Sequence, residues 1–299
     1  MRIFVTGASG WIGSAVVPEL LNAGHKVLGL ARSDASAASI EALGADVQRG
    51  SIDDLDSLRA GAAASDGVVH LAYNHDFSHM DDAARTDRQA IEAFGEILEG
   101  TDRPLVIASG VLGMTLGRAA TERDRPDPAT HPRIANAEAT LALATRGVRS
   151  AVVRFAPTVH GAGDHGFVAR LVEIAREKGV SGYIADGANR WPAVHRLDAA
   201  NLVRLAVDDA PAGSVLHAIG EEGVQTRAIA EAIGRGLKLP VVSVPAEQAS
   251  DHFGWLGFFF GTDSVVSNQL TRELLGWRPT RHGLIDDLDE SHYFEAPHS

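Results

Sequence analysis

Residues 1–13 read MRIFVTGASGWIG, and this stretch decides the fold. The apolar run at 2–5 predicts a short buried strand, and the stretch at 11–21 predicts a helix. Three glycines connect them at a spacing of three: Gly7, Gly10 and Gly13. Glycines between a strand and a helix permit a tight turn and close approach of the backbone to a pyrophosphate, beside a helix N-terminus with free N–H groups. The stretch therefore predicts the first strand–turn–helix unit of a dinucleotide-binding fold.

The same alternation of apolar strands and helices continues through the first half of the chain. Further strands are predicted at 26–30, around Val47, and at 67–71, 105–108 and 151–155. Helices are predicted between them at 35–43, 54–60, 81–98 and 134–145. Near-continuous apolar strands that alternate with helices are typical of a parallel sheet covered on both faces. We therefore expect an α/β fold with a doubly wound parallel Rossmann sheet.

The pattern changes after about Pro157, where glycine, histidine and aromatic residues become frequent. Helices are predicted there at 198–207 and 226–237, and strands at 215–219 and 241–244. We expect a nucleotide-binding Rossmann domain over residues 1–157 and a smaller, mainly substrate-binding region over 158–299. A segment at about 195–220 is expected to return to the Rossmann core.

Composition excludes several classes of protein. The 299 residues carry 27 Lys and Arg against 39 Asp and Glu, a net charge of −12. We expect neither a nucleic-acid nor a membrane partner, because phosphate contacts need a basic face. The absence of cysteine excludes a disulfide framework and thiolate zinc sites. No signal peptide or bilayer-spanning run is visible, so we expect a cytoplasmic protein with a small-molecule substrate, and a homodimer is compatible with the sequence.

The end of the second predicted strand indicates which nucleotide the turn binds. An acidic residue about 20 residues past the glycines would bind the ribose hydroxyls of NAD. This chain has Arg32 and Ser33 there, and a guanidinium can bind a 2′-phosphate through two hydrogen bonds. We expect NADP(H), while Asp34 keeps NAD open. Asp53, after the third strand, could accept from the adenine amino group, cap the helix that begins near Leu55, or do both.

Motifs along the whole chain resemble the extended or atypical short-chain dehydrogenase/reductases, in the group of NAD-dependent epimerases and dehydratases. They are TGASGWIG at 6–13, GSIDDLDSL at 50–58, VVHLA at 68–72, VIASG at 106–110, VRFAPTVHGAGD at 153–164 and AVHRLDAANL at 193–202. LTRELLGWRPT at 270–280 looks like the C-terminal Leu-Gly-Trp-x-Pro motif of that group. The resemblance implies a Rossmann sheet, a nicotinamide cofactor and a small C-terminal substrate domain.

The glycine turn, the end of the second strand and the resemblance together give the residues expected to bind the cofactor. They are Gly7, Ser9, Gly10, Trp11, Ile12, Gly13, Arg32, Ser33, Asp53, Leu71, Ala72, Thr158 and Val159. In the family, the positions of Thr158 and Val159 commonly meet the nicotinamide carboxamide. His160 stands where the family usually has a tyrosine, and we expect it at the pocket rim. His195 and Asp198 match a His-x-x-Asp turn, in which Asp198 would cap a helix.

The catalytic residues of the family are a Ser or Thr and a Tyr-x-x-x-Lys pair, in which the Lys lowers the pKa of the Tyr. Ser109 falls where the family's serine lies. The Tyr–Lys pair is missing, because none of the three tyrosines has a lysine four residues further on. Arg133 aligns with the tyrosine and Ala137 with the lysine. The usual proton transfer is therefore not implied for this chain.

Three residues could take over the chemistry of a carbonyl reduction. Tyr73 follows the fourth predicted strand at its carboxyl end and is the best-placed hydroxyl acid, with a pKa expected to stay near ~10 without a lysine. Arg133 could stabilise an oxyanion as a fixed cation, and Ser109 could hydrogen-bond the substrate oxygen. Each has a plainer alternative: Tyr73 as a pocket wall, Arg133 as a surface residue in a proline-rich loop, and Ser109 as a cofactor contact or turn cap.

Histidine is abundant, but no spacing typical of a metal site is present, so we expect no metal. Two groups lie close in sequence: His70, His75 and His79, and His160, Asp164 and His165. The aromatic stretch at 252–261 has two interpretations. It covers an apolar substrate as a lid, or it belongs to the core or to a dimer face.

These observations favour an NADPH-dependent oxidoreductase that reduces a carbonyl or similar C=X bond of a small apolar substrate. Two alternatives stay open. A nucleotide-sugar epimerase or dehydratase would need a basic cluster for the diphosphate, which Arg170, Arg176 and Arg190 could supply. A non-catalytic NADPH-binding regulator would keep the glycine turn and lack the catalytic pair, as this chain does.

Overall fold

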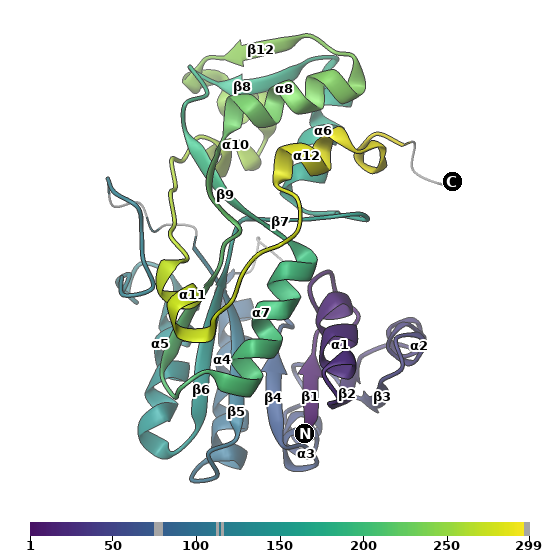
Figure 1. Cartoon of the computed structure of the whole chain (residues 1–299), viewed down its shortest axis with the longest axis vertical. Helices are drawn as coiled ribbons and strands as arrows, with labels where there is room; N and C mark the ends of the chain where they lie inside the picture. The colour runs from purple at the N-terminus through teal and green to yellow at the C-terminus, as the bar shows by residue number, and fades with distance from the viewer. Residues whose placement is uncertain (75–79, 112–113, 115–116, 296–299) are drawn as a thin grey trace.

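Two lobes make up the molecule, one above the other in Figure 1. The structure is a computed structural model, and it describes residues 1–74, 80–111, 114 and 117–295. The lower lobe holds a seven-stranded sheet with helices on its two faces. The upper lobe holds a two-stranded sheet with helices, and a three-stranded sheet lies between the lobes.

The large sheet consists of parallel strands in the order β10-β6-β5-β4-β1-β2-β3. Their bounds are β1 Arg2–Thr6, β2 Lys26–Ala31, β3 Asp46–Arg49, β4 Gly67–His70, β5 Pro104–Gly110, β6 Arg149–Phe155 and β10 Ser214–Ala218. The chain runs outward from β1 to β3, then crosses to the other side of β1 and runs outward from β4. Ligands of open α/β sheets bind at the carboxyl ends of the strands that flank such a reversal. The predicted fold class is confirmed, and β1 and β4 mark its switch point.

Helices cover both faces of this sheet (Figure 1). α1 (Gly13–Asn22), α2 (Asp34–Ala42) and α7 (Arg196–Asp209) lie on one face, and α3 (Leu55–Ala63), α4 (Met80–Leu98) and α5 (Pro132–Ala142) lie on the other. Alternate residues of β1 reach opposite faces, as the pleat of a strand requires. Ile3 and Val5 belong to one core and Phe4 to the other. The sheet is therefore buried on both sides, which explains its near-continuous apolar strands.

The upper lobe has an apolar core of its own. Its elements are α6 (Phe167–Lys178), α8 (Thr226–Leu237), α9 (Ala249–Phe253), α10 (Leu256–Phe260), α12 (Leu284–Asp289), β8 (Ser181–Ile184) and β12 (Val241–Val244). The sheet between the lobes consists of β7 (Thr158–His160), β9 (Arg190–His195) and β11 (Glu221–Gln225). Figure 1 shows the C-terminal part of the chain, in yellow, running from α11 (Gln269–Leu275) beside the lower lobe up to α12.

Most predicted elements agree with the observed ones to within a few residues. The helix predicted at 226–237 and the strand predicted at 241–244 coincide with α8 and β12. The helix predicted at 134–145 is shorter, because α5 ends at Ala142 and a 3₁₀ turn continues to Arg146, before Gly147 at φ 71°. Two more 3₁₀ turns lie at 246–248 and 291–293. In the part of the chain that the structure describes, no helix is both long and apolar enough to cross a bilayer.

Candidate active site

The turn between β1 and α1 is too tight for side chains at two of its glycines. Gly7 has φ +70°, and a Cβ there would lie 2.8 Å from the backbone nitrogen of Ala72. A Cβ on Gly13 would lie 2.0 Å from the carbonyl oxygen of Gly7. Gly10 donates a backbone hydrogen bond of 2.9 Å to the same carbonyl. Only glycine lets β1, the turn and the segment after β4 approach this closely.

The turn presents a helix N-terminus at the switch point of the sheet. α1 begins at Gly13, after Ile12 at the N-cap, and its first turn holds no acidic residue. Its free N–H groups and positive dipole end therefore suit an anion. Ser9 and Gly10 are exposed beside it. This backbone cradle fits the pyrophosphate of a dinucleotide.

Trp11 connects the turn to the segment after β6, which includes Thr158 and Val159. Trp11 donates its ring N–H to the carbonyl oxygen of Val159 at 2.7 Å, and the guanidinium carbon of Arg196 lies 4.0 Å from the Trp11 ring centroid. Thr158 is buried, and its hydroxyl has no hydrogen-bond partner among the described residues. A buried hydroxyl without a partner costs free energy. Contact of Thr158 with a cofactor stays a prediction, because its hydroxyl oxygen is enclosed by protein atoms in this structure.

Arg32 stands at the carboxyl end of β2 without a partner among the described residues. Its side chain is exposed. Asp34, the alternative ribose ligand, pairs with Arg49 at the end of β3. Ser33 caps α2, since its hydroxyl accepts from the Ser36 N–H at 3.2 Å. Sequence reasoning missed Arg49, because the pairing of β2 with β3 brings it to Asp34.

Asp53 and Asp54 have different roles. Asp54 is the N-cap of α3, and its carboxylate accepts from the Ser57 N–H at 3.2 Å. The alternative that Asp53 caps this helix is therefore wrong, because α3 begins at Leu55 directly after Asp54. Asp53 is exposed and has no hydrogen bond or ion pair with a described residue. Recognition of the adenine amino group stays a prediction for it.

Tyr73 and Arg133 meet at the carboxyl edge of the sheet. Tyr73 lies shortly after the end of β4, and Arg133 lies in the first turn of α5. The guanidinium carbon of Arg133 lies 4.1 Å from the centroid of the Tyr73 ring, which is within the range of a cation–π interaction. The fold thus brings together two of the three residues that we expected to carry the chemistry.

Arg133 is held by its own helix and partly removed from water. Pro132 opens α5, and the imidazole of His131 accepts the Arg133 backbone N–H at 3.1 Å. The Nε atom of Arg133 is buried and has no hydrogen-bond partner among the described residues. Burial lowers the pKa of Arg133, while Asp87 and Tyr73 favour its charged form. The alternative of a solvated surface arginine is therefore wrong.

A buried polar chain supplies the negative charge that Arg133 faces. Asp87 of α4 accepts from the Asn136 side chain at 2.6 Å, and its other oxygen lies 3.1 Å from Nε2 of His70. Nδ1 of His70 lies 2.7 Å from the hydroxyl of Thr6. Burial alone would raise the pKa of Asp87, but the hydrogen bonds of His70 and Asn136 and the charges of His70 and Arg133 hold it below its ordinary value. Asp87 therefore stays ionised at neutral pH.

The same chain fixes the backbone that follows β4. The Ala72 N–H donates to the Thr6 hydroxyl at 3.2 Å, and the Leu71 N–H donates to the Thr6 carbonyl at 3.2 Å. Leu71 and Ala72 lie directly against the glycine turn, because a Cβ on Gly7 would meet both of them. Sequence reasoning included Leu71 and Ala72 in the cofactor set but missed Thr6, which orders them.

Tyr73 differs from expectation in its acidity. Burial raises the pKa of Tyr73 above its ordinary value of 10.0, the charge of Arg133 offsets part of this rise, and Asp87 adds to it. The expectation of an unshifted pKa is therefore wrong. Tyr73 is therefore protonated at physiological pH, and its raised pKa makes it a weaker proton donor than an unshifted tyrosine.

Ser109 lies near the carboxyl end of β5, beside β4 in the sheet. It is buried, and its hydroxyl has no hydrogen bond with a described residue. The parallel pairing of β4 with β5 includes His70 opposite Ile107. Tyr73 and Ser109 follow these paired residues by three and two positions, so both emerge at the same edge.

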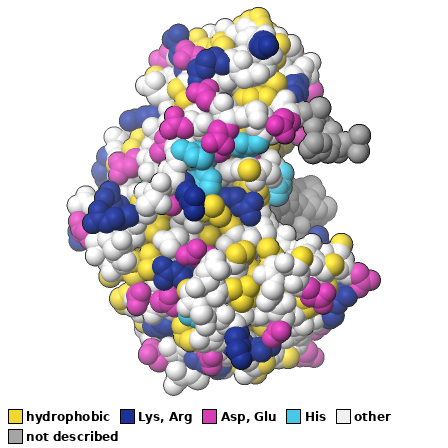
Figure 2. Space-filling model, turned by 45° about the vertical axis from the view of Figure 1, so that its right-hand side comes forward, with side chains coloured by type: hydrophobic (Ala, Val, Ile, Leu, Met, Phe, Trp, Pro, Cys, Tyr) yellow, Lys and Arg dark blue, Asp and Glu magenta, His cyan; other side chains and the backbone are white. Residues whose placement is uncertain are grey.

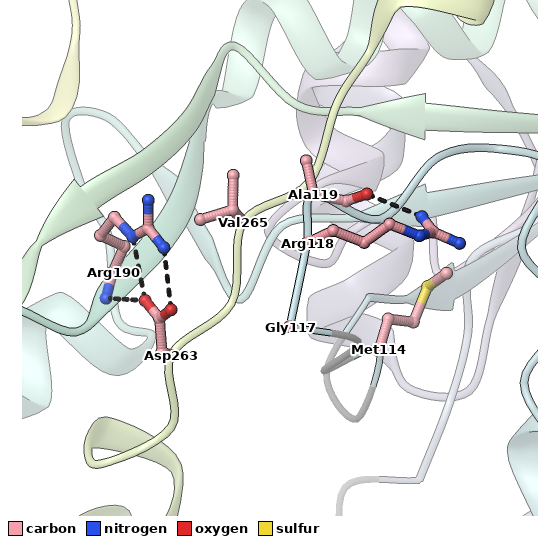
Figure 3. Close-up of a pocket in the computed structure, with 7 residues that line it drawn as sticks. All are labelled: Met114, Gly117, Arg118, Ala119, Arg190, Asp263 and Val265. Atoms are coloured by element: carbon pink, nitrogen blue, oxygen red, sulfur yellow. Dashed lines mark hydrogen bonds and ion pairs between the residues drawn. The ribbon is translucent and has the colours of Figure 1, made fainter.

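A cavity of ≈ 320 Å³ lies beside the segment that follows β5 (Figure 3). It is lined by Met114, Gly117, Arg118, Ala119, Arg190, Asp263 and Val265. Figure 3 shows Arg190 and Asp263 facing each other, with the Arg190 side chain donating two hydrogen bonds of 3.0 and 2.9 Å. Arg118 pairs with Asp124 at 2.6 Å. The charged side chains that line this cavity are therefore already paired within the chain.

The three arginines considered for a sugar diphosphate do not converge. Arg170 pairs with neighbouring glutamates of α6. Arg176 donates to backbone carbonyls near the C-terminus, and Arg190 pairs with Asp263. The structure therefore gives no basic cluster made from these three residues.

The aromatic stretch at 252–261 divides between core and surface. Phe253 and Phe260 are buried in the upper-lobe core. Phe258 is 78% exposed and Trp255 is 51% exposed. Core packing is therefore the role of the buried rings, and two rings remain on the surface.

His195, not Asp198, caps α7. The imidazole of His195 accepts the Leu197 N–H at 3.2 Å. Asp198 lies inside the first turn, where its carboxylate accepts the N–H groups of Thr280 at 3.0 Å and Arg281 at 2.9 Å. The prediction of Asp198 as the cap is wrong, because the helix begins two residues earlier than expected. Asp198 instead ties the C-terminal segment to the lower lobe.

The other histidines considered for a metal have different surroundings, and two of them fall outside the described residues. His160 is buried and lies 2.8 Å from a carboxylate oxygen of Asp287 in α12, so it is not open at a pocket rim. His165 is exposed beside Trp11. His75 and His79 fall outside the residues that the structure describes.

Comparisons with known proteins find relatives that match nearly the whole chain. An uncharacterised protein of Schizosaccharomyces pombe is 48% identical over 296 residues, which is 98% of this chain and 100% of that protein. A 4-hydroxy-2-methyl-3-oxo-4-farnesyl-3,4-dihydroquinoline-1-oxide ketoreductase of Stigmatella aurantiaca is 27% identical over 277 residues, which is 85% of this chain and 80% of that protein.

Solved structures share the fold. The dTDP-glucose 4,6-dehydratase DesIV of Streptomyces venezuelae, solved with NAD bound, superposes with a TM-score of 0.76 at 21% identity, over 98% of this chain and 96% of that one. The family model of the NAD dependent epimerase/dehydratase family matches residues 3–217. The chain therefore belongs to the NAD-dependent epimerase/dehydratase family, a group of NAD(P)-binding enzymes within the short-chain dehydrogenase/reductases.

Proposed function

We propose that this chain is an NADP(H)-dependent reductase of a carbonyl or similar C=X bond in a small apolar substrate. The stacking of Arg133 on Tyr73 carries the proposal, with 4.1 Å between the guanidinium carbon and the ring centroid. A phenol and a fixed cation are the two functions that a Tyr-x-x-x-Lys pair supplies. Here the phenol comes from the segment after β4 and the cation comes from α5.

The chemistry of a carbonyl reduction divides between the cofactor and these residues. A bound nicotinamide supplies the hydride that the carbonyl carbon accepts. Tyr73 gives its phenolic proton to the carbonyl oxygen as negative charge develops there. The tyrosinate that results lies under the guanidinium of Arg133, whose charge stabilises it, and solvent returns the proton. Ser109 donates a hydrogen bond to the same substrate oxygen.

Arg133 acts in this scheme as a cation and not as an acid. A guanidinium holds its proton under all ordinary conditions. Asp87 lies close enough to favour the charged form of Arg133 and is itself ionised. The scheme therefore needs one proton donor, Tyr73, and one permanent positive charge.

The cofactor preference rests on the end of β2. Arg32 is exposed and has no described partner, so its guanidinium is available to a 2′-phosphate. Asp34, which would favour NAD, is paired with Arg49. Asp53 is proposed to accept from the adenine amino group. Thr158 and Val159 are proposed to lie at the carboxamide end of the cofactor.

The substrate class is proposed from one relative and from the cavity after β5, whose lining residues do not include Tyr73, Ser109 or Arg133. The charged residues of the ≈ 320 Å³ cavity are paired with each other or with neighbours, so they do not call for a charged substrate. The relative from Stigmatella aurantiaca is by its name a ketoreductase of a farnesylated quinoline oxide. Residues 158–299 are proposed to shape the substrate pocket, and residues 1–157 to bind the cofactor.

The experiment that tests the proposal measures the oxidation of NADPH in the presence of apolar aldehydes and ketones. We expect turnover with at least one of them, and weaker activity with NADH. Tyr73→Phe should abolish most of that turnover while NADPH binding remains. If NADPH binds much more tightly than NADP⁺ and no carbonyl is reduced, the alternative of a non-catalytic NADPH-binding regulator replaces the proposal.

A nucleotide-sugar epimerase or dehydratase is the second alternative, and titration with UDP-glucose and dTDP-glucose tests it. We expect no binding, because Arg170, Arg176 and Arg190 have other partners. A cytoplasmic location and a homodimer stay predictions; fractionation of the source cells and sedimentation of the purified protein address them.

A further inference from the structure

Four histidines surround one buried aspartate where the C-terminal segment meets the sheet between the lobes. Figure 2 shows histidine side chains gathered on the surface at the waist of the molecule. Asp287 of α12 is the centre of the group, and its side chain is 1% exposed. One carboxylate oxygen lies 2.8 Å from Nδ1 of His160. The other lies 3.0 Å from Nε2 of His282 and 3.7 Å from Nε2 of His292.

His195 completes the group from the end of β9. Its ring centroid lies 5.2 Å from that of His282 and 5.4 Å from that of His160. Nδ1 of His195 accepts the Leu197 N–H at the start of α7, so Nε2 is the nitrogen left to face the group. The ligand atoms of His195, His282 and Asp287 all lie within 4.8 Å of one another.

His292 supplies an independent sign that a partner belongs here. Its Nε2 atom is buried and has no hydrogen-bond partner among the described residues. Asp287, Glu290 and His292 form a second set whose ligand atoms lie within 4.8 Å of one another. Asp287 is common to both sets, so ligands from both sets can approach one point.

We propose that His195, His282 and Asp287 bind a first-row divalent cation, zinc above all, with His292 as a fourth ligand. Imidazole nitrogens with one carboxylate oxygen are ligands that zinc accepts, whereas magnesium and calcium prefer oxygen ligands alone. Ligand atoms at about 2.1 Å from a tetrahedral ion lie roughly 3.4 Å apart. Two nitrogens lie close to this separation from one Asp287 oxygen, Nε2 of His282 at 3.0 Å and Nε2 of His292 at 3.7 Å.

His160 would act as an outer partner of this site. It occupies the second oxygen of Asp287 at 2.8 Å, and a hydrogen bond of this kind fixes a ligating carboxylate in orientation. The expectation of no metal rested on spacing along the chain, and these ligands are scattered over nearly a hundred residues from His195 to His292. Only the fold places them together.

The proposed ion would join the C-terminal segment to the base of α7. His195 immediately precedes Arg196, which stacks on Trp11 of the glycine turn with 4.0 Å between the guanidinium carbon and the ring centroid. His282 and Asp287 belong to the segment that Asp198 also holds, through Thr280 and Arg281. The proposed ion therefore has a structural role. Its binding should raise the stability of the folded protein.

The test uses the full chain without a histidine tag, treated with a chelator that is then removed. Titration with zinc chloride by calorimetry should give one ion per chain and a higher melting temperature, because a ligand that binds the folded state stabilises it. Cobalt(II) should give the visible absorption of a tetrahedral site, and magnesium should give no binding. His282→Ala should weaken zinc binding at least ~10-fold.

Two further variants keep the test decisive. His195→Asn keeps a cap acceptor for α7 while removing a ligand, and it should weaken binding as His282→Ala does. His165→Ala is the matched control, because His165 is an exposed histidine outside both ligand sets, and it should bind zinc as the unaltered chain does. Failure of zinc to bind stoichiometrically, or equal binding by all three variants, would overturn the proposal.

Discussion

The glycine turn after β1 and the Tyr73–Arg133 pair lie at the same edge of the sheet, but they are built in different ways. The turn is made of backbone, and its shape depends on what Gly7 and Gly13 leave out. The pair is made of two side chains from the segment after β4 and from α5, and it forms only when those elements pack. A site made of backbone atoms depends on consecutive residues. A site made of side chains can combine residues from different helices and strands and keep the same chemistry.

Under the proposed function, this difference explains how the family's Tyr–Lys pair can be absent while a phenol and a cation still meet at the sheet edge. Arg133, which the resemblance aligns with the family's tyrosine, supplies the cation from α5, and Tyr73 supplies the phenol from the segment after β4. The turn has no comparable freedom, because another residue at Gly13 would collide with the backbone of Gly7. Substitutions in the two regions should therefore fail in different ways.

The largest effect is expected from Gly13→Val. A Cβ at this position would lie 2.0 Å from the Gly7 carbonyl oxygen, and backbone cannot yield as a flexible side chain can. We expect NADPH binding to weaken more than ~100-fold, and the free energy of unfolding to fall by about 2 kcal/mol or more. Calorimetry measures the NADPH affinity, and denaturant unfolding measures the free energy of unfolding. Gly110→Ala is the control for stability, because a Cβ there would meet nothing within 4 Å; equal losses in both variants would contradict the steric argument.

Tyr73→Phe tests the side-chain site and should leave the turn untouched. It keeps the ring under Arg133 and removes only the hydroxyl, so NADPH binding should stay unchanged while kcat falls by ~10²–10⁴-fold. Tyr183→Phe is the matched control, because Tyr183 also lies under an arginine, with 5.4 Å from its ring centroid to the guanidinium carbon of Arg227. This second stack lies in the upper lobe, so its hydroxyl should not matter to turnover.

Arg133→Met sharpens the same comparison. It removes the cation and keeps much of the side chain's bulk, so kcat should fall by ~10²–10³-fold. When Tyr73→Phe is combined with it, the second loss should be much smaller than in the unaltered chain, because residues that act as a unit are non-additive. Fully additive losses in kcat would mean that the two residues act separately.

Arg32→Ala should have a smaller effect, confined to the nucleotide. Hydrogen bonds to a charged group contribute roughly 1.5–3 kcal/mol, so NADPH binding should weaken by ~10–100-fold and NADH binding should change little. Arg49→Ala distinguishes the two arginines, because Arg49 is paired with Asp34. Titrations of both variants with NADPH and NADH measure the difference. Equal losses for the two nucleotides in Arg32→Ala would contradict the assignment of Arg32 to the 2′-phosphate.

Much of the fold was predictable because its signals are local. Strands of the large sheet are buried on both faces and read as continuous apolar runs, and the glycines at 7, 10 and 13 mark the first turn. Errors fell at helix starts, where the choice between neighbouring caps depends on geometry. Asp54 and His195 cap α3 and α7, where Asp53 and Asp198 were considered.

The candidate site was less predictable, because its contacts join residues far apart in sequence. Tyr73 and Arg133 were each proposed from their own surroundings, but their contact needs α5 to pack against β5, β6 and α4. Asp87 was missed altogether. It lies among the buried residues of α4, between Ala84 and Ile91. A charged residue on the apolar side of a predicted helix was the sequence feature that could have identified it.

The buried chain from Thr6 through His70 to Asp87 joins the two regions, because Thr6 directly precedes the glycine turn and Asp87 faces Arg133. Asp87→Asn keeps the shape and removes the charge. We expect the free energy of unfolding to fall by about 1 kcal/mol at neutral pH. The pKa of Asp87 is lowered in the folded protein, so its contribution is fully present above the unfolded value of about 3.9 and is lost as the pH falls below it.

Denaturant unfolding between neutral pH and pH 3 measures this difference, which should shrink as the solution becomes more acidic. Asp53→Asn is the control, because Asp53 is exposed and has no described partner, and it should leave the free energy of unfolding unchanged. If Asp87 has a positioning role, kcat should fall more than NADPH affinity in Asp87→Asn. The charge of Asp87 acts directly on Arg133, whereas Asp87 reaches the glycine turn only through its hydrogen-bonded partners. If NADPH affinity falls as much as kcat, the buried polar chain supports the glycine turn as much as it supports Arg133. The shape of the turn would then depend on these side chains as well as on its glycines.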